Sequence, residues 1–300
     1  MTIGQFFGIV EMRTKIISLT TFAMGLAYAY YFTGKFDPLL ALVMLVSVLC
    51  VDMGTTGFNA YFDYRNGTDR AHRNSEQNKV LLHQGVAAAA ALRVSVVLFA
   101  GAVITGIVLA ALTSWYIIPV GAVCMGVGYL YTGGPFPISR TPLGEVAAGG
   151  FLGTVLFMLT WFVQTGTVSW NAVLVSLSSS ALVASILTAN NTCDLENDRE
   201  AGRYTLSIMV GRRFSEWIIY LLGSGAYLWA GLMIAAGWLP LLLIPFLAAG
   251  LTASITIFRG MHAAGYGERT KDPIMGRVAK IYLLFGAVFV IGLMSIALAG

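Results

Sequence analysis

The sequence predicts an all-α, polytopic membrane protein, and three observations support this prediction. Hydrophobic residues make up 57% of the 300 positions and charged residues only 11%, with a mean hydropathy of +0.78. An average soluble domain carries about 25% charged residues, so these charges are too few to cover a surface that faces water. Apolar runs of spanning length recur along the chain, and the basic residues fall almost entirely between alternate runs. We therefore expect most of the outer surface to face lipid.

The apolar runs predict about nine transmembrane helices. A helix needs about 20 apolar residues to cross the hydrocarbon core of a bilayer. With that window the predicted spans are 15–34, 38–62, 86–112, 115–132, 143–164, 170–193, 214–235, 238–258 and 276–299. The intervals between them are too short for a soluble domain, so residues 1–300 are expected to form a single intramembrane domain.

The distribution of basic residues predicts the orientation of these spans. With nine spans, 17 of the 18 Lys and Arg residues, Lys15 among them, fall at the N-terminus or in the connections on the same side, and only Lys35 lies opposite. Such a bias marks the cytoplasmic face, so the N-terminus is expected inside and the C-terminus outside. The isoelectric point near 9.0 then reflects topology and anionic lipid headgroups, and no nucleic-acid partner is expected.

The acidic residues, only 14 in number, form two similar groups at the cytoplasmic ends of the second and sixth spans. The side chains concerned are Asn59, Asp63 and Asp69 after the second span, and Asn190, Asn191, Asp194 and Asp198 after the sixth. In each group an asparagine stands four residues before an aspartate, which puts amide and carboxylate on one helical face. Because an offset of four helices preserves direction across the membrane, both groups are expected to emerge on the same face.

The two acidic groups predict a metal site. Carboxylates stacked one helical turn apart repel each other, and ionised groups at the membrane edge are costly, so a bound cation best explains them. The histidines and cysteines show no metal-ligand spacing. Hard oxygen ligands favour Mg²⁺, held by Asp63, Asp69, Asp194 and Asp198. For Glu76, Glu200, Glu216, Glu268 and Asp272, neutralisation of the basic loops is explanation enough.

Asp52 is a separate case, since it lies eleven residues before Asp63 and deeper in the same helix. An ionisable residue at such depth is functional by default. Two interpretations stay open, namely a place in the cavity wall and a hydrogen bond to a neighbouring helix. Lesser candidates for the site are Tyr129, Tyr131, Glu145 and Gln164. The segment 131–137, Tyr-Thr-Gly-Gly-Pro-Phe-Pro, is an irregular turn that glycine and proline explain without any function.

The two acidic groups resemble the motifs of a known family. Asn59-xxx-Asp63-xxxxx-Asp69 resembles the first aspartate-rich motif of the UbiA family of intramembrane prenyltransferases, and Asp194-xxx-Asp198 resembles the second. The resemblance covers nearly the whole chain, because that family also has nine spans with motif loops after the second and sixth. One departure is Ala60, where the family usually has an aspartate.

Within the family, the chain is most similar to the members that prenylate 1,4-dihydroxy-2-naphthoate. The supporting features are the segment 131–137 followed by Leu143-Gly144-Glu145, the doubled Asn190-Asn191, and the pattern Glu-Asn-Asp-x-x-x-Gly-Arg-x-Thr-Leu over 196–206.

The resemblance implies roles for particular residues. The four aspartates would bind Mg²⁺, while Asn59 and Asn190 or Asn191 would orient ligands. Lys79 and Arg203, which come from the motif loops, are the expected diphosphate-binding residues. Asp52 and Tyr131 would line the substrate cavity. That cavity is expected at the centre of the helices, open to the cytoplasmic side and to lipid.

The function implied is Mg²⁺-dependent transfer of a polyprenyl group from polyprenyl diphosphate to an aromatic acceptor. For 1,4-dihydroxy-2-naphthoate the reaction releases CO₂ and belongs to menaquinone biosynthesis, in a prokaryotic cell membrane. Other acceptors, such as 4-hydroxybenzoate or homogentisate, stay open. The alternative from a different class is a cation-coupled secondary transporter. Transporter sites lie near mid-membrane on interrupted helices, whereas these acidic groups end helices at one face.

Overall fold

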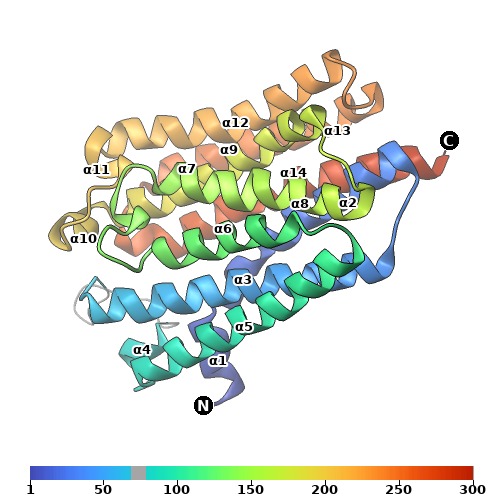
Figure 1. The fold of residues 1–300 in the computed structure, drawn as a ribbon. Coiled ribbons are helices and arrows are strands. Elements are labelled where there is room, and N and C mark those ends of the chain that lie inside the picture. Colours follow the sequence, from blue (N-terminus) through green and yellow to red (C-terminus); the bar gives the residue numbers. More distant parts are fainter. Residues whose placement is uncertain (69–78, 300) are drawn as a thin grey trace.

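The computed structural model describes residues 1–68 and 79–299, and within these ranges it consists of helices and connecting loops without a strand (Figure 1). Asp69, one of the predicted metal ligands, lies outside the described residues. The long helices are α2 (Ile16–Thr33), α3 (Pro38–Arg65), α5 (Ala88–Leu112), α6 (Ile117–Leu130), α8 (Leu156–Thr165), α9 (Trp170–Cys193), α12 (Arg212–Ala235), α13 (Ile244–Ala264) and α14 (Lys271–Ala299). The short ones are α1 (Ile3–Ile9), α4 (Val80–His83), α7 (Gly144–Ala148), α10 (Leu195–Glu200) and α11 (Leu206–Val210).

A helix occurs at each of the nine predicted spans, but one of them is too short to cross a bilayer alone. In the described ranges, eight helical segments are long and apolar enough to cross. The fourth predicted span, 115–132, contains only α6, whose 14 residues cover roughly 21 Å at 1.5 Å per residue, against about 30 Å of hydrocarbon. Its end is set by Gly133, Gly134 and Pro135. The prediction of nine full spans is therefore not confirmed.

The helix α9 lies at the centre of the bundle and is the most buried of the spanning segments. It packs against α12, α14 and the segment that precedes α8. Its serines make this packing possible, because Ser178 Oγ donates to the carbonyl of Ala226 at 3.0 Å and Ser185 Oγ to that of Ile219 at 3.1 Å. Small and hydroxylated residues let helices approach closely in membranes, which explains a serine-rich segment at the core.

The fifth predicted span, 143–164, is a helix whose middle is wound as a π-helix, η3 (Gly149–Val155), between α7 and α8. A Cβ atom added at Gly149 would lie 2.6 Å from the carbonyl oxygen of Ser180, and one at Gly153 would lie 2.4 Å from its Cα. Only glycine allows this contact with α9. A π-helical segment often accompanies a functional site, and this one lies beside the cavity described below.

The N-terminal region corrects one prediction. A 3₁₀ turn, η1 (Met12–Lys15), precedes α2, and the Lys15 side chain is only 3% exposed, with its Nζ 2.6 Å from Asp52 Oδ1. The expectation that Lys15 belongs to the cytoplasmic loop charges is therefore wrong. Its position follows from the start of α2, which lies beside the middle of α3 and so brings the lysine into the bundle.

Candidate active site

A cavity of about 880 Å³ lies between α3, α5, α6, α8 and α9. One end is apolar, with walls formed by Met44, Val48, Ile107, Ile118, Leu159 and Val163. This end is level with the beginning of α3, because Gln164 at the end of α8 hydrogen-bonds the backbone of Asp37 at 2.8 and 3.2 Å. The opposite end contains acidic, basic and amide side chains. The cavity thus combines a polar mouth with an apolar interior.

Ten of the eleven predicted site residues lie on the wall of this cavity, and the eleventh is Asp69. The ten are Asp52, Asn59, Asp63, Lys79, Tyr131, Asn190, Asn191, Asp194, Asp198 and Arg203. They come from α3, from the loops after α3 and α6, and from α9 with the segment that follows it. Two sequence regions more than a hundred residues apart are thus brought to one end of one cavity. The lesser candidate Gln164 lies at the other end, where it joins two helix ends.

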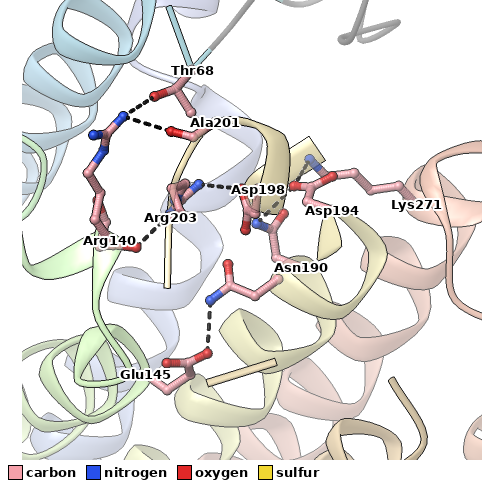
Figure 2. Close-up of polar contacts among 11 residues, drawn as sticks. Thr68, Arg140, Glu145, Asn190, Asp194, Asp198, Ala201, Arg203 and Lys271 are labelled. Carbon is pink, nitrogen blue, oxygen red and sulfur yellow. Dashed lines mark hydrogen bonds and ion pairs between the residues drawn. The ribbon is translucent and has the colours of Figure 1, made fainter. Parts of the chain in front are cut away.

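The second aspartate-rich segment is held by two basic residues (Figure 2). Lys271 Nζ, at the start of α14, lies 2.6 Å from Asp194 Oδ2, which also accepts from Asn190 Nδ2 at 3.4 Å. Arg203 Nη1 lies 2.8 Å from Asp198 Oδ1. Charge-assisted bonds of this length are strong. Each of the two aspartates therefore faces a cation supplied by the chain itself.

Burial changes the acid–base behaviour of the Asp198–Arg203 pair. The Asp198 side chain is only 5% exposed, and this burial raises its pKa to about 6, although Arg203 opposes the shift. Burial works to lower the pKa of Arg203, but Asp198, Asp63 and other neighbours outweigh it and raise that pKa. The guanidinium therefore stays charged, while the carboxylate becomes protonated at mildly acidic pH.

Asn191 is positioned by Glu145, a residue from α7. The Asn191 Nδ2 atom donates to Glu145 Oε1 at 2.8 Å, and both side chains are buried. Asn191 forms part of the cavity wall, whereas Glu145 lies behind it. The structure therefore gives Glu145, a lesser candidate from the sequence, the place of a supporting residue.

The first aspartate-rich segment lies at the end of α3. Its Asn59 Oδ1 accepts a hydrogen bond of 2.7 Å from Thr132 Oγ1, and Asp63 lies one turn further along the helix. Lys79, after the undescribed residues of this loop, pairs with Glu11 at 3.1 Å. Lys79 is also the main reason that the pKa of Glu11 is lowered. Both partners lie on the cavity wall.

Asp52 satisfies both interpretations left open by the sequence. It belongs to the cavity wall, and it also bonds a neighbouring helix, since Ser18 Oγ donates to its Oδ2 at 2.6 Å and Lys15 Nζ to its Oδ1. Lys15 also donates to Thr56 Oγ1 at 2.6 Å. A lysine and an aspartate buried near mid-bundle are thus fully engaged with each other and with hydroxyl groups.

Several residues at the polar end were not predicted as site residues. Lys271 was counted only with the loop charges, and Glu11 was not considered, while Glu268 and Asp272 also reach the cavity wall. One signal was available for Lys271. A lysine in the first turn of a long apolar helix opposes the helix dipole, which favours acidic residues there, so another partner has to stabilise it. That partner, Asp194, is 77 positions away in sequence, which is why the sequence alone does not reveal it.

The polar end has a donor set that fits Mg²⁺. Among residues 1–68 and 79–299 no three His, Cys, Asp or Glu side chains gather closely enough to hold a metal by themselves. Mg²⁺ is usually bound by one or two carboxylates together with substrate phosphates, so such a cluster is not required. The buried Asp198 Oδ2 has no hydrogen-bond partner in the described part of the chain, and a cation beside it would satisfy this oxygen.

Comparison with known proteins places this architecture in a family. The model of the UbiA prenyltransferase family matches residues 18–265. A 1,4-dihydroxy-2-naphthoate octaprenyltransferase of Bacillus subtilis is 33% identical over 237 residues, which cover 79% of this chain and 76% of that protein. UbiA prenyltransferase domain-containing protein 1 of Gallus gallus is 30% identical over 280 residues, or 92% of this chain and 80% of that protein.

Solved structures share the fold. A UbiA homologue from Archaeoglobus fulgidus, bound to GPP and Mg²⁺, superimposes with a TM-score of 0.71 over 97% of this chain and 99% of that one, at 13% sequence identity. The similarity of fold thus extends over nearly the whole chain, and the sequence similarity identifies the family. This chain belongs to the UbiA prenyltransferase family and is an integral membrane enzyme that transfers a prenyl group.

Proposed function

We propose that the enzyme transfers a polyprenyl group from a polyprenyl diphosphate to 1,4-dihydroxy-2-naphthoate, with Mg²⁺ and with loss of CO₂, as a step in menaquinone biosynthesis. The observation that carries this proposal is the cavity itself, in which side chains of both aspartate-rich segments surround one end of a long apolar interior. A polyprenyl diphosphate has the same two-part character, with a charged head and an apolar tail.

The chemistry of the donor follows from the residues at the polar end. Asp63, Asp194 and Asp198, with Asp69, would hold Mg²⁺, which when bound neutralises charge on the leaving diphosphate. Lys79, Arg203 and Lys271 line the same end and are suited to bind diphosphate oxygens. Because Lys271 and Arg203 already lie against Asp194 and Asp198, both cations are in reach of a diphosphate held there.

The apolar part of the cavity protects the reacting carbon. Cleavage of the bond between the allylic carbon and the diphosphate oxygen leaves an electron-poor carbon that water would capture, so the site has to exclude water. Valine, leucine and isoleucine side chains form this part of the wall. Tyr131, whose pKa is raised by burial, stays protonated and presents a hydroxyl donor beside the polar end. A ring carbon of the acceptor then forms the new bond, and the ring carboxylate leaves as CO₂.

The identity of the acceptor is supported by the relatives. The Bacillus subtilis protein and a protein of Mycobacterium leprae, 29% identical over 264 residues, are both named 1,4-dihydroxy-2-naphthoate octaprenyltransferase. Two structures of the Archaeoglobus fulgidus homologue are bound to DMAPP or GPP together with Mg²⁺, which supports the same donor class and metal for this chain.

The orientation proposed from the basic residues has the polar end facing the cytoplasm. In Figure 1, α10, α11 and α4 lie at one end of the bundle, and the C-terminus lies at the other. Cysteines introduced near Asn66 and Arg203 should be labelled by an impermeant reagent only from the cytoplasmic side, and one near Lys35 only from outside. Labelling of the two motif loops from opposite sides would contradict a shared site.

An acceptor panel tests the reaction. The protein purified in detergent would be supplied with geranylgeranyl diphosphate, Mg²⁺ and one acceptor at a time. We expect prenylation of 1,4-dihydroxy-2-naphthoate with one CO₂ released per product, and poor use of 4-hydroxybenzoate and homogentisate. Efficient use of either of these, with dihydroxynaphthoate inert, would contradict the acceptor assignment while leaving prenyl transfer intact.

A further inference from the structure

The loop between α6 and α7 touches both aspartate-rich segments. Its sequence, from Tyr131 to Thr141, contains two glycines and two prolines, which account for the turn. They do not account for the contacts that its other side chains and its backbone make with the polar end of the cavity.

On one side the loop contacts the first segment. Thr132 is only 5% exposed, and its Oγ1 donates to Asn59 Oδ1 at 2.7 Å. The next residue, Gly133, lies so close to α3 that an added Cβ would be 2.7 Å from the ring of Phe62. The loop backbone therefore packs directly against the end of α3. The hydroxyl group of Thr132 fixes the side-chain amide of Asn59 in the first segment.

On the other side the loop contacts the second segment, as Figure 2 shows in part. Arg203 Nη2 donates to the carbonyl of Ser139 at 2.8 Å, and the backbone N–H of Tyr204 donates to the carbonyl of Arg140 at 2.8 Å. Arg140 Nη2 reaches both segments, with Ala201 O and Thr68 Oγ1 each 3.4 Å away. Arg140 thus joins the first motif loop to the second.

The loop is also fixed within itself. The backbone N–H of Ser139 donates to the carbonyl of Tyr131 at 2.8 Å, so the loop closes on its own beginning. Thr141 Oγ1 donates to the carbonyl of Ile138 at 2.8 Å. A loop closed in this way can hold the two elements that it contacts at a fixed separation.

We propose that the loop 131–141 sets the separation of the two aspartate-rich segments, with Thr132 and Arg140 as positioning residues. The inference rests on the proposed function, in which a metal and a diphosphate bind between these segments. Groups that bind such a ligand have to be held within about 0.5 Å of the productive geometry. Thr132 holds the amide of the first segment, and Arg140 holds the two loops together.

The test compares three threonine variants in detergent. Thr132→Val removes the donated hydrogen bond at constant shape, Thr132→Ser restores a hydroxyl, and Thr252→Val removes a hydrogen bond to the carbonyl of Ala248 within α13, away from the cavity. We expect Thr132→Val to raise the Mg²⁺ concentration for half-maximal prenyl transfer roughly tenfold, the size of one buried hydrogen bond of about 1.4 kcal/mol. The KM for the acceptor should be unchanged. Thr132→Ser should recover most of the loss, and Thr252→Val should behave as the wild type.

A binding measurement separates positioning from a general loss of stability. The rise in melting temperature caused by Mg²⁺ with farnesyl thiodiphosphate, an unreactive donor analogue, should shrink in Thr132→Val and Arg140→Ala. It should persist in Thr252→Val and in Arg199→Ala, whose arginine is exposed and pairs with Glu196. A lower melting temperature with an undiminished ligand-induced rise would overturn the inference, as would an unchanged Mg²⁺ requirement.

Failure of the inference is distinguishable from failure of the proposed function. If the wild type shows no Mg²⁺-dependent prenyl transfer to any aromatic acceptor, the proposed function is wrong. If the wild type is active and Thr132→Val responds to Mg²⁺ as the wild type does, only the role of the loop is wrong.

Discussion

The two aspartate-rich segments look alike in sequence but are held differently in the structure. In the second segment Asp194 pairs with the distant Lys271 and Asp198 with Arg203 of the same loop, at 2.6 and 2.8 Å, and the two carboxylate side chains are 16% and 5% exposed. In the first segment it is the amide, Asn59, that is fixed by a neighbouring loop, while Asp63 is only half-buried at the end of α3. Among the described contacts, ion pairs therefore hold the carboxylates of the second segment, and a neutral hydrogen bond holds the amide of the first.

This difference indicates how each segment responds to ligands. In the proposed function, Lys271 and Arg203 would give up their contacts with Asp194 and Asp198 when these carboxylates hold a metal. Once displaced, each cation lies next to the place where a diphosphate would bind, so metal and diphosphate binding are expected to support each other. At the first segment the described contact is the neutral hydrogen bond between Thr132 and Asn59. Substitutions in the two segments should therefore affect activity alike but stability differently.

The largest effect is expected from removing a carboxylate charge in either segment. Asp63→Asn and Asp194→Asn keep the shape of the side chain but remove a metal ligand, so we expect turnover to fall by about 10²–10³-fold, the scale typical for loss of one group that stabilises developing charge. Prenyl transfer at saturating donor and acceptor measures this. The protein should remain folded in detergent. Near-normal turnover of either variant at ordinary Mg²⁺ concentration would contradict a site shared by both segments.

Substitutions in the two segments should lower the melting temperature by different amounts. Asp198→Asn leaves the guanidinium of Arg203, which is only 15% exposed, without its counter-charge, and breaking a buried pair in this way costs about 3 kcal/mol. The melting temperature of Asp198→Asn should therefore fall well below that of Thr132→Val, which removes only the neutral hydrogen bond to Asn59. The double variant Asp198→Leu with Arg203→Met should regain stability but not activity. Equal melting temperatures for the two single variants would show that the second segment is not braced by charge.

Much of the fold could be predicted from the sequence because the membrane imposes its own pattern. Apolar runs of spanning length located all nine helices, and the even span count between the two acidic groups placed them at one end. The burial of Lys15 could not be predicted, because its partner, Asp52, lies 37 positions away. No local pattern distinguishes a lysine at the end of a loop from one inside the helix bundle. The shortness of α6 escaped because Tyr116 and Tyr131 at its ends look as apolar as the helix itself.

The residues of the site could be predicted from the sequence, but the contacts that hold them in place could not. The acids, amides and two of the basic residues were predicted from their spacing and from the family resemblance. The partners that hold them, Lys271, Glu145 and Thr132, could not be assigned, because each pairing joins different helices or loops across 46 to 77 positions. Such pairings depend on how helices pack, and helix packing leaves no local signal in the sequence.

The ion pair Lys15–Asp52 provides a further comparison, because it lies away from the proposed metal ligands. Asp52→Asn leaves Lys15 charged among apolar helices and should lower stability by about 3 kcal/mol, although the bonds to Ser18 and Thr56 soften the loss. The Mg²⁺ and donor concentrations for half-maximal activity should not change. Replacing both partners, with Lys15→Met and Asp52→Leu, should restore the melting temperature. A raised Mg²⁺ requirement in Asp52→Asn would mean that the pair reaches the metal site.

The smallest expected effect is a pH dependence that belongs to the second segment. Because burial raises the pKa of Asp198 from 3.8 to about 6, this carboxylate takes up a proton as the pH falls through 6, and a protonated carboxyl binds metal poorly. The Mg²⁺ concentration for half-maximal binding of the donor analogue should rise about twofold between pH 7.5 and pH 6, and about tenfold by pH 5. An aspartate with the ordinary pKa would still be more than about nine-tenths ionised at pH 5 and would give almost no change. The midpoint of the rise therefore reports whether the buried aspartate is a ligand, and a Mg²⁺ requirement that stays flat down to pH 5 would exclude Asp198 from the metal site.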